Sequence, residues 1–301
     1  EKQYKTKRSG KMAYLCVSDR DRWTPVDWTA YDAGHLAFQY VRNGSFMRVA
    51  TYEDGTLCFL TDPFYVDKQS NENCYYPAGK GKEDVVLYAK CDIGRENMFR
   101  DRMIGGVFEG SNHPDFLEKD TLFIIQGRPN RLNTTVKSWS DKKYRYLRYF
   151  GPPRSACNIS EVAFYEKNDT VALSGKVIGT PGCYQHDGTH EYTNVFDGKT
   201  WTSFDYFKPT GGWAGLDLGR KVCVDRIVYT PRNRDNYVRP DDVYELFYCD
   251  RDWKSAGKIK ATADSLVFRD IPVNTLLLLR NHTRGLDERI FIYENGTQLW
   301  K

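Results

Sequence analysis

Short runs of β-branched and aromatic residues recur along the whole chain, and Gly, Pro, Asn or Asp residues separate them. One example is FMRVATYEDGTLCFL, where Glu53-Asp54-Gly55 is a tight-turn signal between two alternating runs. Aromatic residues make up 15% of the chain, including 21 Tyr and 16 Phe, and such residues are enriched in strands. The sequence therefore predicts an all-β protein.

Two pairs of matching landmarks indicate that one architecture occurs twice. VFDG at 195–198 is followed by ERIFIYEN at 288–295, and VFEG at 107–110 is followed by SEVAFYEKN at 160–168. In each pair, a short acidic segment that we expect to be a turn precedes a strand that carries a glutamate near its start. A chain of 301 residues has room for two or three modules of about 100 to 150 residues.

A polar stretch at 67–82, rich in Asn, Gly and Lys, predicts an exposed connection. We therefore expect an N-terminal β unit over residues 1–80, a shortened sandwich over 81–170 and a complete sandwich over 171–301. The shortened middle portion leaves two possibilities open. It is either a trimmed module, or the N-terminal unit supplies its missing strands and residues 1 to about 170 form one body.

Charge and hydropathy exclude several classes of partner. The net charge of +4 comes from 44 basic and 40 acidic residues spread along the chain, so there is no coherent field for a polyanion and we expect no nucleic-acid partner. No apolar run approaches the ~18 residues of a membrane span. The chain begins with Glu1 and shows no signal peptide, which suggests a mature product or a piece of a longer protein. The eight cysteines are spread out, and we expect mostly buried free thiols.

Six motifs of the last portion carry a family resemblance. They are VFDGKTWT, GWAGLDLG, RIVYTPR, YELFYC, LLLLRN and ERIFIYEN. With them, residues 171–301 resemble the discoidin family, also called coagulation factor 5/8 type C or galactose-binding-like domains. The resemblance implies an eight-stranded antiparallel jelly roll, so that the expected fold is tandem antiparallel β-sandwiches with a discoidin-like jelly roll last.

The segment TPRNRDNYVRPDDVYELFY is similar in sequence to the C-terminal regions of large secreted Bacteroidetes proteins. Some of those proteins carry a transglutaminase-like or papain-like domain upstream. The resemblance therefore implies an exported chain, located outside the cell, at the cell surface or in the periplasm.

The Asp-Gly turn at 197–198 is a candidate calcium site. In the sugar-binding discoidin relatives a structural calcium commonly lies at this turn. The resemblance assigns side-chain oxygens to Asp197, Thr202 and Glu288, and a carbonyl oxygen to Lys199, because Ca²⁺ takes ~6 to 8 oxygen ligands. The alternative is that Asp197 accepts amide hydrogen bonds inside its own turn and Glu288 pairs with Arg284 or Arg289, so that no ion is needed. The corresponding site at Glu109 lacks the hydroxyl and is a poorer candidate.

Loop aromatics form the candidate ligand platform. Trp201, Tyr206, Phe207 and Tyr237 fall on connections, where an aromatic face could lie beneath a sugar ring. Four neighbouring side chains could donate hydrogen bonds beside it: Arg232, Asn233, Asn236 and Arg239. The alternative is that these aromatic rings cap the ends of the sandwich.

No motif supports catalysis. The segment GCYQHDGTH at 182–190 gathers Cys183, His186, Asp187 and His190, but it lacks the fourth ligand of a zinc site and is typical of a solvated loop. We expect a non-catalytic region that binds a glycan or glycoprotein, with calcium as a structural ion. The alternatives are a structural spacer or protein-docking module for an upstream domain, and an unrecognised hydrolase or lyase with converging carboxylates.

Overall fold

The computed structural model is an all-β structure of several antiparallel sheets, as the sequence predicts. Its helical segments within the described residues are α1 (Asn97–Asp101) and the 3-10 segments η2 (Tyr184–His186) and η3 (Tyr192–Phe196). The structure describes residues 2–4, 11–31, 35–41, 44–91, 97–284 and 288–300.

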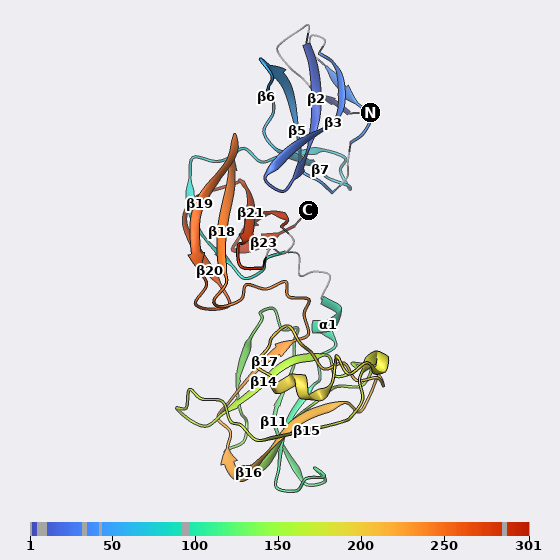
Figure 1. The fold of residues 1–301 in the computed structure, drawn as a ribbon, viewed down its shortest axis with the longest axis vertical. Helices are drawn as coiled ribbons and strands as arrows, with labels where there is room; N and C mark the ends of the chain where they lie inside the picture. The colour runs from blue at the N-terminus through green and yellow to red at the C-terminus, as the bar shows by residue number, and fades with distance from the viewer. Residues whose placement is uncertain are drawn as a thin grey trace. The chain divides into compact units, whose positions relative to one another are not determined.

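The chain divides into two compact units. Unit 1 comprises residues 1–92 and 238–301, and unit 2 comprises residues 93–237. Unit 2 is therefore inserted into the chain of unit 1. In Figure 1 unit 1 combines the two ends of the colour scale, and unit 2 takes the middle of the scale, from teal through green and yellow to orange.

Unit 2 contains a five-stranded sheet of order β11-β10-β13-β16-β15 and a three-stranded sheet of order β12-β17-β14, both antiparallel. The strands are β10 (Val107–Ser111), β11 (Lys119–Ile124), β12 (Thr134–Lys137), β13 (Lys143–Phe150), β14 (Ile159–Tyr165), β15 (Lys176–Gly179), β16 (Trp213–Cys223) and β17 (Arg226–Pro231).

One hydrophobic core lies between these two sheets. Phe108 of the larger sheet contacts Phe164 and Tyr229 of the smaller one, with ring centroids 6.2 and 5.4 Å apart. Successive side chains of a strand face opposite sides. In β14, Val162 and Phe164 are accordingly buried, whereas Ala163 between them is half-buried. Within the larger sheet, Gly215 allows β16 to approach β13, since a Cβ there would lie 2.2 Å from the Leu147 carbonyl oxygen.

The division into units differs from the predicted modules 81–170 and 171–301. Strands β13 and β14 of the predicted middle module pair with β16 and β17 of the predicted last module, so the predicted boundary at residue 170 crosses a single core. The landmark VFEG at 107–110 is part of strand β10, with no turn. These pairings join residues far apart in the chain, which a local pattern does not reveal.

The N-terminal part of unit 1 holds a six-stranded sheet of order β3-β2-β5-β7-β8, with β6 paired to β5, and a β1-β4 pair. The strands are β1 (Lys2–Tyr4), β2 (Lys11–Asp19), β3 (Arg22–Tyr31), β4 (Leu36–Phe38), β5 (Met47–Glu53), β6 (Thr56–Phe59), β7 (Phe64–Val66) and β8 (Asn73–Tyr75).

The C-terminal part of unit 1 holds a five-stranded sheet of order β19-β18-β21-β22-β23 and the pair β20-β9. The strands are β9 (Lys82–Leu87), β18 (Val243–Asp250), β19 (Asp252–Lys260), β20 (Leu266–Pro272), β21 (Leu276–Asn281), β22 (Ile290–Glu294) and β23 (Thr297–Leu299).

Strand β9 belongs to the core of the C-terminal part. Val85 and Leu87 are fully buried there with Tyr244, Leu246 and Phe291. The start of the predicted middle module thus packs with the end of the chain. The N-terminal strands share unit 1 with these residues, so they do not complete a sandwich with residues 93–170.

All eight cysteines are free thiols, and four of them are buried: Cys16, Cys157, Cys183 and Cys249. No helix in the described part of the chain is both long and apolar enough to cross a membrane.

Candidate functional site

Several loops of unit 2 emerge at the same end of its two sheets. The end of β13 at Phe150 pairs with the starts of β10 and β16, at Val107 and Trp213. The start of β14 at Ile159 pairs with the end of β17 at Pro231. The loops that adjoin these strand ends form what we call the loop rim, made of residues 97–106, 151–158, 180–212 and 232–237.

The turn at residues 197–202 is closed by its own polar groups. The Asp197 carboxylate accepts a hydrogen bond from the Lys199 amide at 2.8 Å and from the Thr202 hydroxyl at 3.0 Å. The same hydroxyl lies 2.8 Å from the Lys199 carbonyl oxygen, and Gly198 adopts a left-handed φ of 77°. Three of the predicted calcium ligands, Asp197, Lys199 and Thr202, therefore lie together. The amide hydrogen bond of the alternative prediction, from Lys199 to Asp197, is formed in the same turn.

A second carboxylate, from Glu161 on β14, faces this turn. Its Oε1 accepts hydrogen bonds from the amides of Gly198 and Lys199, at 2.9 and 3.1 Å. Burial, followed by the adjacent Asp197 carboxyl group, raises the pKa of Glu161 to about 8. We call Asp197, Lys199, Thr202 and Glu161 the acidic corner.

Glu288, which was predicted to close this site, belongs to unit 1. Arg280 donates two hydrogen bonds to its carboxylate, at 2.7 and 3.0 Å, and this pairing raises the pKa of Arg280. Glu109 is likewise part of an ion pair, since Arg148 lies 2.6 Å from its carboxylate in the interior of unit 2. Both glutamates thus have arginine partners, and Glu161 occupies the position beside the turn that was assigned to Glu288.

The acidic corner offers oxygen atoms of the kinds that calcium binds. It contains two carboxylates, one hydroxyl and one backbone carbonyl, and hard cations prefer oxygen ligands. Within the described ranges, no three His, Cys, Asp or Glu side chains gather in a way that could hold a metal ion. Calcium here would therefore need the hydroxyl, the carbonyl and water to complete its shell. The two adjacent carboxylates fit a shared cation, because without one they share a proton or repel each other.

The four predicted platform aromatics divide into two surface and two core residues. Trp201 and Phe207 are 44% and 40% exposed, whereas Tyr206 and Tyr237 are 8% and 1% exposed. The Phe207 ring centroid lies 5.1 Å from that of His186. Only Trp201 and Phe207 of the four can offer a ring to a ligand, because the two tyrosines are buried.

The polar residues predicted beside the platform mainly support the loops. Arg232 forms an ion pair with the buried Asp205. Asn233 is buried and donates hydrogen bonds to two backbone carbonyls. Asn236 is half-buried, and Arg239 is a buried residue of unit 1.

A buried polar network connects the loops of the rim. The Asp205 carboxylate accepts hydrogen bonds from Asn158, at 2.6 Å, and from Arg232. Asn158 in turn accepts a 2.9 Å hydrogen bond from Arg102, and the guanidinium of Arg232 lies over Phe99 at 4.5 Å. This network fixes the loops that surround the rim surface, because buried polar groups with satisfied partners hold one geometry. No local sequence pattern indicates this network.

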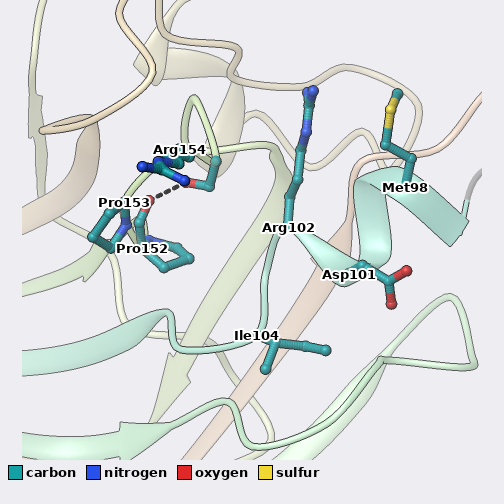
Figure 2. Close-up of a pocket in the computed structure, with 8 residues that line it drawn as sticks. Met98, Asp101, Arg102, Ile104, Pro152, Pro153 and Arg154 are labelled. Atoms are coloured by element: carbon teal, nitrogen blue, oxygen red, sulfur yellow. Dashed lines mark hydrogen bonds between the residues drawn. The ribbon is translucent and has the colours of Figure 1, made fainter.

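A pocket of about 520 Å³ opens between α1 and the loop at 151–155. Arg102 stands between the helix and this loop in Figure 2. The lining comes from two segments about 50 positions apart, so no local sequence pattern indicates the pocket. The lining residues are Met98, Asp101, Arg102, Ile104, Pro152, Pro153, Arg154 and Ser155.

The histidine-containing segment 182–190 is a loop held by its own contacts. Cys183 is buried and forms a β-bridge with Tyr206. Asp187 accepts hydrogen bonds from the amide and the hydroxyl of Thr189, which lower its pKa. His190 lies 3.3 Å from the Ser203 hydroxyl. These contacts stabilise the loop.

Comparison of the chain with protein-family models, with curated proteins and with solved structures found no match.

Proposed function

We propose that unit 2 is a non-catalytic carbohydrate-binding module of the galactose-binding-like type, in an exported adhesion protein. The observation that carries the proposal is the pair of exposed rings, Trp201 and Phe207, on a loop rim fixed by buried polar contacts. The antiparallel sandwich of five and three strands supports the family resemblance, although the strands come from residues 97–237 and not from 171–301.

Binding would use the faces of the two rings. The apolar C–H face of a pyranose ring packs on an aromatic face, while donors beside the ring select hydroxyl positions. His186 and Lys208 lie next to Phe207, with the Lys208 ammonium 5.3 Å from the ring centroid. Such a shallow surface binds single sugars weakly and selects by shape.

Calcium would have a structural role in this module. Asp197, Glu161, the Thr202 hydroxyl and the Lys199 carbonyl would hold it, and the ion would neutralise two adjacent carboxylates. Its position would tie the turn at 197–202 to strand β14. Trp201 lies within that turn, so the bound ion would also help to hold the platform residue in place.

The test is binding of the full chain to a glycan array, followed by affinity electrophoresis with the glycans that bind. Trp201→Ala and Phe207→Ala should each weaken binding, by about tenfold where a ring packs on the sugar, since such contacts contribute ~1 to 2 kcal/mol. The matched control is Trp139→Ala. Trp139 is also exposed and lies just before the start of β13, at the opposite end of that strand from the loop rim.

The proposal predicts that the control binds as the unchanged chain does. Retention of full affinity by both platform variants would refute the platform. A chain that binds no glycan on the array would fit the spacer or docking role instead.

A further inference from the structure

We propose that the pocket between α1 and the loop at 151–155 binds the anionic group of an acidic sugar, a carboxylate or a sulfate ester on a pyranose ring. This inference rests on the proposed carbohydrate-binding function and adds the class of glycan. The volume of about 520 Å³ lies within the range of small-ligand sites.

The pocket has an excess of positive charge. Two of its lining residues are arginines, Arg102 and Arg154, and one is an acid, Asp101. Both oxygens of Asp101 accept hydrogen bonds from Arg128, at 2.6 and 2.9 Å. The acid is therefore neutralised by a residue outside the lining, and the two guanidinium groups are left to attract an anion.

Arg102 is oriented before any ligand arrives. Its Nη1 donates a 2.9 Å hydrogen bond to Asn158, which is 1% exposed and is held by Asp205. A guanidinium has five N–H donors, and among the described residues Arg102 has no carboxylate partner. Its remaining donors can therefore form the paired hydrogen bonds that planar oxyanions accept. Figure 2 shows this side chain rising from the end of α1.

Arg154 lies on a strained loop. Its φ is 63°, and Ala156 and Cys157 also adopt left-handed φ values, of 53° and 54°. The loop keeps this conformation because the buried Ser155 hydroxyl donates to the Pro152 carbonyl at 2.6 Å and accepts from the Cys157 amide at 3.0 Å. Strained residues that the surroundings hold in place cluster at ligand-binding sites. The guanidinium of Arg154 has no ion pair within the described residues.

The other walls are apolar. Met98 and Ile104 are 52% and 42% exposed, and Pro152 and Pro153 form the facing wall (Figure 2). These apolar side chains can pack against the C–H face of a pyranose ring, while the two arginines beside them bind one anionic substituent of the same ring. An inorganic anion would use only the arginines.

The experiment is isothermal titration calorimetry of the full chain with four probes: trigalacturonate, its methyl ester, galactose 6-sulfate and galactose. We expect at least one anionic probe to bind about tenfold more tightly than its neutral counterpart, and the preference to shrink as salt rises. Preference for trigalacturonate would identify a carboxylate, and preference for galactose 6-sulfate would identify a sulfate. Either result supports the proposal.

The variant Arg102→Gln/Arg154→Gln should abolish this preference. The single variant Arg154→Gln, on an exposed side chain outside the buried network, should weaken binding of the anionic probe and leave both the fold and galactose binding unchanged. The matched control, Lys119→Gln/Lys137→Gln, removes two exposed charges at the opposite end of the same sheets and should have no effect.

Equal binding of trigalacturonate and its ester, together with equal binding of galactose 6-sulfate and galactose, would overturn the proposal. Unchanged anion binding in the arginine variants would do so as well. If neutral glycans still bind through Trp201 and Phe207 in that case, the proposed function stands and only the acidic class is wrong. If no glycan binds at all, both proposals fail.

Discussion

The Glu161→Gln variant tests whether the acidic corner holds a cation or a proton. Glutamine keeps the oxygen that accepts the amides of Gly198 and Lys199. It also has an N–H group that can donate to Asp197. The variant therefore imitates the protonated form of Glu161 at every pH.

The expected magnitude follows from the pKa of Glu161, which rises from 4.5 to about 8 on folding. Between these two values the folded chain holds a proton that the unfolded chain releases, so the free energy of unfolding falls as pH rises. The free energy of unfolding falls by about 1.4 kcal/mol for each pH unit in this range. The total loss is about 3 kcal/mol between pH 4.5 and neutrality. The loss ends above the folded pKa.

The assay is urea unfolding of the full chain, with and without calcium, from about pH 5 to about pH 8.5. The measured quantity is the difference in unfolding free energy between the unchanged chain and Glu161→Gln, because this difference removes the contribution of other titrating groups. Without calcium it should move by about 4 kcal/mol in favour of the variant as pH rises over this range. With excess calcium, the unchanged chain should recover that stability and the variant should respond much less.

Glu288→Gln is the matched control. It also removes a glutamate that was predicted to bind calcium, but one that pairs with Arg280 in unit 1, and its calcium response should equal that of the unchanged chain. A difference between Glu161→Gln and the unchanged chain that stays constant over this pH range would refute the raised pKa. Equal calcium responses of all three chains would refute the calcium site.

Two further substitutions test the packing of unit 2 by urea unfolding. Gly215→Ala should destabilise the chain by about 1 to 3 kcal/mol, because its Cβ would lie 2.2 Å from the Leu147 carbonyl oxygen; an unchanged transition would show that β13 and β16 are further apart. Glu109→Gln should cost about 3 to 5 kcal/mol, because Arg148 would remain buried without its counter-charge, and the double variant Glu109→Gln/Arg148→Met should recover part of that loss, whereas additive costs would mean that the two residues do not interact.

Local features of the fold could be predicted from the sequence. The turn at Glu53-Asp54-Gly55 is confirmed, since β5 pairs with β6 across it and Asp54 and Gly55 adopt left-handed φ values of 50° and 79°. The all-β class is also confirmed. Both depend on neighbouring residues, whose preferences for turns and strands act over a few positions.

The partner of the Asp-Gly turn could not be predicted in the same way. Glu161 and Glu288 precede similar aromatic strand patterns, and nothing local distinguishes the one that faces Asp197. The outcome depends on which strands pair, and Glu161 lies on a strand that comes before the turn in the chain. A search that allowed the glutamate strand to precede the turn would have included it.

The buried network and the pocket had no sequence signal either. Asn158 and Asp205 are polar residues in segments that read as ordinary connections, and their burial follows from the packing of loops distant in sequence. Arg102 and Arg154 are separated by 52 positions in the sequence and line one pocket, and this proximity also follows from the packing of distant loops.

The insertion of unit 2 within unit 1 has a mechanical consequence. Strand β9 precedes unit 2 in the chain and pairs with β20, which follows it. A tensile load applied through residues 2 and 300 must therefore break contacts of unit 1 before any tension reaches residues 93–237. The β9-β20 pair therefore carries part of this load, and the loop rim is not stretched for as long as the pair stays intact.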